Sequence, residues 1–129
     1  MRKILVVDDD RQIREIYRRV LEIEGYPTAE AGDWEAVTEA LLEHPDIGLI
    51  LLDIHMPDVS GDVVYRVARL HDPHIRVIVS SVYPLDEQKR IILKADDYFD
   101  KSEGTGLLVR KVRQVLSQPV STAATEVTE

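Results

Sequence analysis

The chain alternates between short apolar runs and longer segments whose apolar residues recur with helical spacing, and this alternation strongly constrains the fold. The runs at residues 4–7, 47–52 and 75–79 are unbroken and rich in Ile, Leu and Val. Such runs are typical of strands that are buried on both faces of a parallel sheet. Shorter extended stretches are predicted at residues 28–31 and 98–99.

The segments between these runs predict amphipathic helices. In residues 10–24 the apolar side chains fall at i, i+3, i+4, i+7 and i+8, and Gly25 follows where a helix would end. Further helices are predicted at residues 34–43, 86–95 and 107–116, and another begins at the Ser60-Gly61 pair. The side chains expected on the inner faces of the first and third helices are Ile13, Ile16, Tyr17, Val20 and Leu21, and Val63, Val64, Val67, Ala68 and Leu70.

Five strands that each precede a helix predict an α/β fold with right-handed crossovers. A chain of 129 residues suffices for one hydrophobic core. We therefore predict a single doubly wound five-stranded parallel sheet with helices on both faces, in one domain over residues 1–117. The small and polar residues 118–129 indicate a flexible tail or the start of a linker.

Charge and composition argue against several classes of protein. Asp and Glu number 24 against 16 Lys and Arg, and the formal charge of −8 disfavours direct binding to nucleic acid. The lack of cysteine excludes disulfides and thiolate metal sites and is typical of the reducing cytosol. The opening MRKILVVDDD has too few consecutive apolar residues for a signal peptide or a membrane span. We expect a cytoplasmic protein that binds neither nucleic acid nor membrane.

Acidic residues follow two of the predicted strands. Asp8, Asp9 and Asp10 come after the first strand, and Asp53 ends the third. In a doubly wound sheet with strand order 2-1-3-4-5, the first and third strands are neighbours, so these acids would meet at one edge of the sheet. Carboxylates that lie so close repel one another unless a cation intervenes. A hard divalent ion such as Mg²⁺, which prefers oxygen ligands, would suit the site.

Two further polar residues follow the later strands. Lys101 comes after the fifth strand, where its ammonium group could hold the oxygens of a phosphoryl group. Ser81 ends the fourth strand in RVIVSSV and could donate a hydrogen bond to one of those oxygens. An aspartate can be the nucleophile for such a group, forming an aspartyl phosphate. Asp53 is the candidate acceptor.

Four motifs carry a resemblance to a known family. MRKILVVDDD, LILLDIHMPDVSG, RVIVSSV and DDYFDKS, in this order and spacing, resemble the receiver domain of two-component response regulators. The resemblance covers residues 2 to about 117 and implies a flavodoxin-like fold. It also implies a signalling switch, not a turnover enzyme, that takes a phosphoryl group from a sensor histidine kinase or a phosphotransfer protein.

The resemblance assigns roles around the phosphoacceptor Asp53. Asp9 and Asp53 would ligate Mg²⁺ or Mn²⁺ through their side chains, and His55 through its backbone carbonyl. Asp8 would act mainly through water. Lys101 takes the position of the lysine that pairs with the phosphoryl group.

The resemblance also implies a route to an output. Ser81 and Tyr98 occupy the positions of the switch hydroxyl and the switch aromatic residue. The fourth helix, fifth strand and fifth helix would form the face that binds a downstream protein target or a second copy of the chain. His55 and Tyr83 occupy the positions that often tune hydrolysis of the phosphoryl group. Because both are bulky, we expect them to hinder water and prolong the phosphorylated state.

The chain departs from the family pattern in two places. Lys101-Ser102 stands where the family usually has Lys-Pro, often with a cis bond, and a cis bond is costly without proline. The stretch KADDYF at residues 94–99 is two residues shorter than the usual KAGADDY type. This deletion lies between the fourth helix and the fifth strand, and so affects the output face.

Simpler interpretations exist for several of these residues. Asp8, Asp9 and Asp10 precede a helix, where acids cap amide groups, and Asp10 is the one most suited to be only a cap. Ser81 could bond locally and Tyr98 could be part of the core. His71 and His74 flank a proline and are expected in an exposed loop.

Two other functions fit parts of the pattern. The first is a degenerate receiver that binds partners without phosphorylation. The Lys-Ser loop and the shortened connection are compatible with this function. The second is a Mg²⁺-dependent aspartyl phosphatase. The first strand lacks the Asp-x-Asp-x-Thr or Val pattern of that class, which disfavours the second function.

Overall fold

A computed structural model describes residues 2–119, which form one α/β unit. In chain order the elements are β1 (Lys3–Val7), α1 (Arg11–Ile23), β2 (Thr28–Ala31), α2 (Trp34–Glu43), β3 (Ile47–Asp53), β4 (His55–Met56), β5 (Val59–Ser60), α3 (Gly61–His71), β6 (Arg76–Ser81), α4 (Leu85–Ile91), β7 (Asp97–Asp100), the 3₁₀ helix η1 (Lys101–Glu103) and α5 (Thr105–Ser117). Five strands pair in parallel in the order β2-β1-β3-β6-β7. Counted among these five strands alone, this is the predicted order 2-1-3-4-5. The predicted fold class is confirmed.

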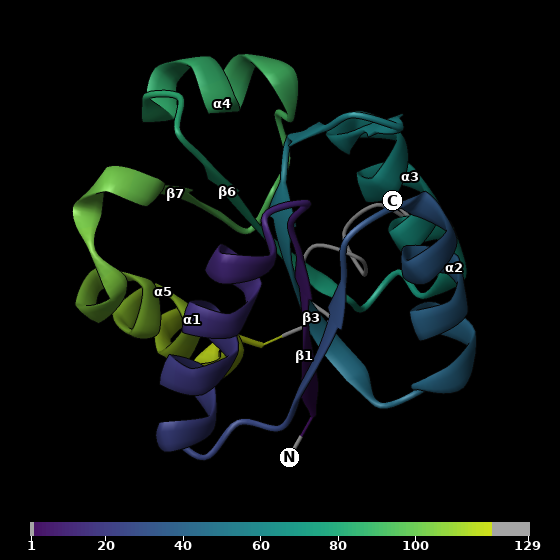
Figure 1. The fold of residues 1–129 in the computed structure, drawn as a ribbon, viewed down its shortest axis with the longest axis horizontal. Coiled ribbons are helices and arrows are strands. Elements are labelled where there is room, and N and C mark those ends of the chain that lie inside the picture. The colour runs from purple at the N-terminus through teal and green to yellow at the C-terminus, as the bar shows by residue number, and fades with distance from the viewer. Residues whose placement is uncertain (1, 120–129) are drawn as a thin grey trace.

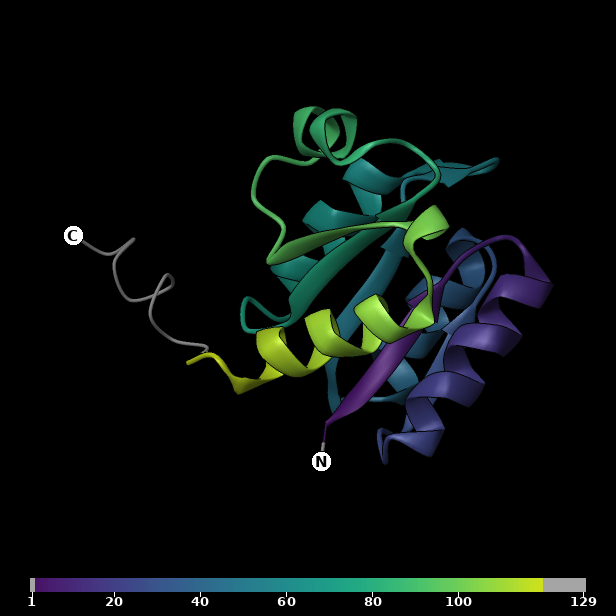
Figure 2. The same cartoon turned by 90° about the vertical axis from the view of Figure 1, so that its left-hand side faces the viewer.

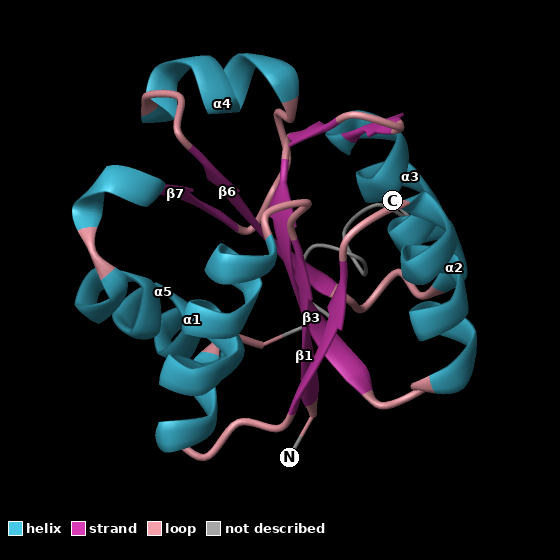
Figure 3. Cartoon of the chain, viewed as in Figure 1, coloured by secondary structure: helices cyan, strands magenta, loops and turns pink. Residues whose placement is uncertain are grey.

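The helices form layers on both faces of the sheet. In Figure 1 the sheet is seen nearly edge-on, with α1 and α5 on one side and α2 and α3 on the other. The colouring by secondary structure in Figure 3 shows the same layers. Figure 2 faces the side of α1 and α5, which are joined by an ion pair between Arg113 and Glu24 at 2.8 Å.

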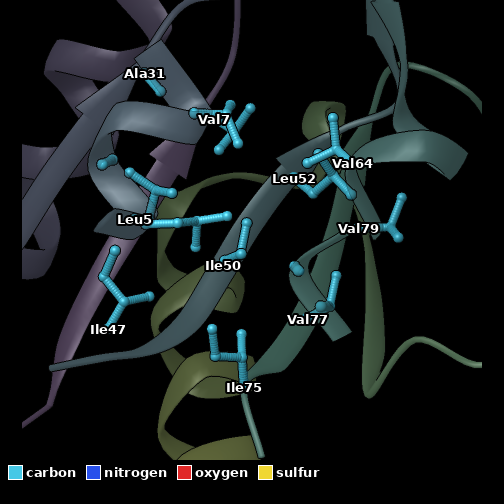
Figure 4. Packing of buried hydrophobic residues seen from close by; sticks show 14 of the residues in the cluster. Leu5, Val7, Ala31, Ile47, Ile50, Leu52, Val64, Ile75, Val77 and Val79 are labelled. Carbon is cyan, nitrogen blue, oxygen red and sulfur yellow. The ribbon is translucent and has the colours of Figure 1, made fainter. Parts of the chain in front are cut away.

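Each face of the sheet has its own hydrophobic core because successive strand residues point to opposite faces. The core under α2 and α3 is seen in Figure 4 and includes Leu5, Val7, Ile50, Leu52, Val64 and Val77. The core under α1 and α5 includes Ile4, Val6, Tyr17, Leu21, Leu49, Leu51, Phe99, Leu108 and Val112. The unbroken apolar runs in β1, β3 and β6 supply both cores, as expected for strands covered on both sides.

Polar side chains begin three of the helices. The carboxylate of Asp10 accepts a hydrogen bond from the N–H of Gln12 at 2.9 Å, and that of Asp33 accepts one from Ala36 at 2.8 Å. The hydroxyl of Ser60 caps α3 as the sequence predicts. These bonds satisfy amide groups that have no partner inside the helix.

The inner faces of two helices are narrower than predicted. Leu70 was expected to be buried but is 85% exposed, because Val64 and Ala68 are the side chains of α3 that enter the core. Ile16 is 47% exposed on α1, whereas Tyr17 and Leu21 are buried. Helical spacing alone does not decide how much of an apolar stripe the sheet covers.

The fourth helix is shorter than predicted, since α4 ends at Ile91 and not at Ala95. Ile92 has extended backbone angles and is buried. The Tyr98 hydroxyl donates to the carbonyl of Ile92 at 2.5 Å and accepts from the N–H of Ala95 at 3.2 Å. These bonds satisfy backbone groups that a longer helix would have paired internally.

A small hairpin that the sequence did not predict follows the central strand β3. β4 and β5 pair antiparallel, and the N–H of Gly61 donates to the carbonyl of Ile54 at 3.1 Å. At the hairpin turn, the carboxylate of Asp58 accepts from the N–H of Trp34 at the start of α2 at 2.9 Å. The chain that leaves Asp53 is therefore attached to two helices.

We predict that Gly61→Ala destabilises the fold, because an added Cβ would lie 2.8 Å from the Cα of Ile54. The free energy of unfolding in urea should fall by about 1–3 kcal/mol. Gly106→Ala is the matched control, since a Cβ at this position of α5 meets nothing within 4 Å. The control should be neutral or stabilising by up to about 1 kcal/mol. Equal stability of the two variants would contradict this prediction.

Candidate functional site

The acids of the first and third long strands meet at the carboxyl edge of the sheet. β1 and β3 are neighbours with Val7 opposite Leu52, so Asp8 and Asp53 leave the sheet side by side. One carboxylate oxygen from each of Asp8, Asp9 and Asp53 lies within 4.8 Å of the others. Asp10 is the N-cap of α1 and is not a member of this group.

Asp8 is the most constrained acid of the cluster. It is 2% exposed, and one carboxylate oxygen accepts from the N–H of Asp10 at 2.9 Å. The other lies 2.6 Å from Nζ of Lys101. Asp9, by contrast, is exposed. The cluster thus presents one free carboxylate to solvent beside two that are held by the protein.

Asp53 is a buried carboxylate with an unusually high pKa. It is 4% exposed, and one of its oxygens accepts from the N–H of His55 at 3.1 Å. Burial raises its pKa from 3.8 to about 6; the charge of Lys101 and the bond from His55 oppose this shift, whereas Asp8 and Asp9 add to it. Burial, more than repulsion from the other acids, therefore sets the high pKa of this carboxylate.

Lys101 brings the positive charge of the site. Its Nζ lies 3.6 Å from the second oxygen of Asp53, besides the closer contact with Asp8. Burial lowers the pKa of Lys101, but the hydrogen bond that its ammonium group donates to Asp8 and the charge of Asp53 outweigh burial and raise it. The ammonium group is therefore charged at neutral pH.

The loop that carries Lys101 has a specific local structure in place of the Lys-Pro of the family pattern. Among residues 2–119 every peptide bond is trans, including Lys101-Ser102. The carboxylate of Asp100 accepts from the N–H of Ser102 at 2.9 Å and from its hydroxyl at 2.8 Å. A proline at position 102 would have no N–H to donate. These two bonds begin η1 directly after β7.

Ser81 is placed near the cluster by the strand that neighbours β3. β6 pairs with β3 so that Ser80 lies opposite Asp53, and Ser81 is the next residue and the end of the strand. Ser81 is fully buried, and its Oγ accepts from the N–H of Tyr83 at 3.1 Å. β6 is one residue longer than the predicted 75–79, and Ser81 ends it as predicted.

Two aromatic side chains meet beside the cluster. The rings of His55 and Tyr83 contact each other edge to face, with centroids 4.5 Å apart. Their backbone N–H groups bind the carboxylate of Asp53 and the hydroxyl of Ser81, respectively. The ring pair therefore links the loops that follow β3 and β6.

Tyr98 lies away from the cluster, on the strand that leads to Lys101. It is 8% exposed and packs in the core under α2 and α3. Burial raises the pKa of its hydroxyl, although the N–H of Ala95 opposes the shift. In this structure Tyr98 is a core residue that holds the end of α4.

The donor set of the cluster fits a hard divalent cation. Mg²⁺ prefers carboxylate and carbonyl oxygens and leaves several coordination positions to water or phosphate. Asp8, Asp9 and Asp53 offer three carboxylate oxygens in one place, beside the ammonium group of Lys101.

The chain matches the protein family described as response regulator receiver domain over residues 4–113. The chain belongs to the response regulator receiver domain family. This receiver domain is 33% identical over 117 residues to the transcriptional regulatory protein CpxR of Escherichia coli (strain K12), with 90% of the chain and 50% of that protein covered. The chain spans about half the length of this relative.

Solved structures share the fold of the receiver domain. A receiver domain protein (CheY-like) from Methanospirillum hungatei JF-1 superposes with a TM-score of 0.82 and 28% identity, covering 91% of this chain and 94% of that chain. The response regulator protein TrrA from Thermotoga maritima, in complex with Mg²⁺-BeF, gives a TM-score of 0.79 and 31% identity, covering 89% and 99%. The acidic cluster of this receiver domain fits the Mg²⁺ binding seen in that protein.

Three polar residues around the site carry no role in the sequence motifs. Gln88 is fully buried, and its amide donates to the carbonyls of Tyr83 at 2.7 Å and Phe99 at 2.9 Å. Arg14 donates to the carbonyl of Asp8 at 2.7 Å. The spacing Asp-x-Ser could have indicated the turn at Asp100, but no local pattern marks Gln88 or Arg14. His71 and His74 are exposed, as predicted, but only His74 lies in a loop, because His71 ends α3.

Asp53 should make the metal-free domain less stable as pH rises. Because its pKa is higher in the folded state, the folded state binds a proton more tightly between pH 3.8 and about 6, and stability falls through this window. We predict that the free energy of unfolding of Asp53→Asn rises relative to that of the wild type by about 1–3 kcal/mol between pH 4 and 7. The measurement is urea unfolding in EDTA.

Glu30→Gln tests the opposite pH dependence of stability. The hydrogen bond from Arg14 lowers the pKa of Glu30 below its ordinary 4.5, so this carboxylate stabilises the fold above that pH. The variant should lose stability relative to the wild type as pH rises. A difference between Asp53→Asn and the wild type that does not change with pH would contradict the assignment of Asp53.

Proposed function

We propose that this receiver domain is a phosphorylation-dependent switch in which Asp53 accepts a phosphoryl group from a phosphohistidine. The donor would be a sensor histidine kinase or a phosphotransfer protein. One observation carries the proposal: the Asp53 carboxylate lies beside two further carboxylates, with Lys101 Nζ 3.6 Å away. Such a cluster combines a nucleophile, a cation site and a positive charge for phosphoryl oxygens.

The transfer exchanges one bond to phosphorus for another. A carboxylate oxygen of Asp53 bonds to phosphorus, the bond from phosphorus to the imidazole nitrogen breaks, and that nitrogen keeps the electron pair. The N–H of His55 already holds one Asp53 oxygen at 3.1 Å, which orients the carboxylate. The ammonium group of Lys101 would give up part of its contact with Asp8 and Asp53. It would then donate to an oxygen of the phosphoryl group.

The metal would be held by two carboxylates of the acidic cluster and one backbone carbonyl. Asp9, Asp53 and the backbone carbonyl of His55 would be its ligands, and Asp8 would act mainly through water; Mn²⁺ suits the same donors. A bound Mg²⁺ would neutralise charge on the carboxylates and on the transferring phosphoryl oxygens. Asp8 and Asp53 are buried, whereas Asp9 is exposed.

The switch would start at Ser81. Its hydroxyl would donate to a phosphoryl oxygen on Asp53, and because Ser81 Oγ accepts from Tyr83, a shift of Ser81 would displace the start of the β6–α4 connection. Gln88 binds the carbonyl of Tyr83 and would pass this displacement to α4. Tyr98, which holds the end of α4 through Ile92, is the second switch residue.

The output would involve the face formed by α4, β7 and α5. Val82 and Leu93, which flank α4, are 71% and 77% exposed. We propose this face as the site for a downstream protein target or a second copy of the chain. The receiver unit would comprise residues 1–117, and a tail or linker would follow from 118; residues 120–129 lie outside the described part of the chain. Within the described residues, no helix is long and apolar enough to span a membrane.

Phosphorylation at Asp53 can be tested with acetyl phosphate and Mg²⁺. We expect the wild type to gain the mass of one phosphoryl group and Asp53→Asn to gain none, because the amide is not a nucleophile. Asp33→Asn is the matched control, since Asp33 is an acid that caps α2. This variant should be labelled like the wild type. An unlabelled wild type, under conditions that label a known receiver, would favour the phosphorylation-independent binding module.

The lifetime of the phosphorylated form should depend on the ring pair of His55 and Tyr83. Because these rings contact each other beside the acceptor, they would hinder the approach of water. We predict that His55→Ala or Tyr83→Ala speeds loss of the phosphoryl group by roughly 3- to 10-fold, equivalent to about 1 kcal/mol in activation free energy. Val82→Ala, a neighbouring exposed site, should leave the rate unchanged. Complete loss from the wild type within seconds would contradict the proposal.

A further inference from the structure

Arg14 connects the first helix to the backbone of the acidic cluster. Its Nη1 donates to the carbonyl oxygen of Asp8 at 2.7 Å, and its Nε binds the carboxylate of Glu30 on β2 at 2.8 Å. The Arg14 side chain is only 16% exposed. A guanidinium group with two fixed partners and little exposure has a defined orientation.

Gly32, which directly follows β2, leaves the space that this guanidinium group occupies. A Cβ at position 32 would lie 2.5 Å from Nη1 of Arg14 and 3.1 Å from its Cζ. Nη1 is the atom that donates to the carbonyl of Asp8. The same contact can therefore be disturbed from two positions that are far apart in the sequence.

Every polar group of Asp8 is held by a different part of the chain. Its N–H donates to the carbonyl of Ala31 at 3.1 Å, its carbonyl accepts from Arg14, and its two carboxylate oxygens accept from Asp10 and Lys101. The carbonyl of Asp8 belongs to the peptide group that joins Asp8 to Asp9. Its orientation therefore sets the direction in which the exposed Asp9 leaves the backbone.

We infer that Arg14 is a positioning residue for the metal site, acting through the peptide group between Asp8 and Asp9. The inference rests on the proposed function, in which these two acids serve a divalent cation. Arg14 touches neither the cation nor the phosphoryl group. It orients the exposed ligand Asp9 toward the buried Asp53. Its own charge is neutralised by the ion pair with Glu30.

A second arginine of α1, Arg18, attaches the helix to β2 independently of Arg14. Nη1 of Arg18 binds the second oxygen of Glu30 at 2.6 Å, and its Nε binds the hydroxyl of Thr28 at 3.2 Å. α1 therefore stays attached to β2 when Arg14 is replaced. The loss from Arg14→Ala should fall on the metal site more than on global stability.

The test measures the dissociation constant of Mn²⁺ by electron paramagnetic resonance, together with urea unfolding in EDTA. We expect Arg14→Ala to weaken Mn²⁺ binding about 10-fold, in the range typical of residues that orient a ligand. Gly32→Ala should weaken it in the same direction by displacing Nη1. Arg14→Lys, which keeps the charge and a donor, should recover part of the affinity.

Two control variants test whether a change in the charge or the stability of α1 alone affects Mn²⁺ binding. Arg19→Ala removes an exposed pair with Glu15 on the same helix and should leave the affinity for Mn²⁺ unchanged. Arg18→Ala removes contacts of α1 with Glu30 and Thr28 on β2 but none with Asp8, so its affinity should stay near that of the wild type. Affinity that follows unfolding stability across all the variants would overturn the positioning role.

The outcomes distinguish this inference from the proposed function. Mn²⁺ binding by the wild type with an equal constant in Arg14→Ala overturns the positioning role alone and leaves the switch in place. Failure of the wild type to bind Mn²⁺ overturns the metal site and the positioning role with it. A 10-fold loss in Arg14→Ala, with Arg19→Ala unchanged, supports both.

Discussion

Repulsion among three carboxylates at the ends of two neighbouring strands is the interaction on which the rest of the site depends. The parallel pairing of β1 with β3 brings Asp8 and Asp53 together in a buried place, and Asp9 adds a third charge. Lys101 contacts two of the three carboxylates, and burial is the main reason why the pKa of Asp53 is raised to about 6. A site with excess negative charge is suited to a divalent cation, and a cation with a lysine is suited to a phosphoryl group.

The elements around the cluster each hold one part of it. Arg14 fixes the backbone of Asp8, the N–H of His55 fixes the carboxylate of Asp53, and Asp100 shapes the loop of Lys101. Gln88 then joins the β6–α4 connection to β7 through two backbone carbonyls. These contacts are hydrogen bonds of defined direction, and those of Gln88 attach α4 to the backbone of Tyr83 and Phe99.

The sequence was a good guide to the strands and to the charged residues of the site. The apolar runs identified β1, β3 and β6, and the acids that stop the runs at Asp8 and Asp53 lie together as expected. It was a poorer guide to α4, because the bonds that Tyr98 makes with Ile92 and Ala95 come from a strand that lies beyond the helix in the chain. The exposure of Leu70 and Ile16 was likewise missed, since it depends on how far the sheet extends under each helix.

By itself the sequence determined the order of the elements and the residues that end the strands, because hydrophobic period and strand-ending acids are local properties of the chain. Only the tertiary structure decided which polar groups hold those residues. Arg14 reaches Asp8 across a helix turn and past Gly32, and Gln88 reaches Phe99 from another element. It also decided that the Lys101-Ser102 peptide bond is trans and that the carboxylate of Asp100 accepts from the N–H of Ser102. Such contacts depend on distances between elements, and no spacing along the chain encodes them.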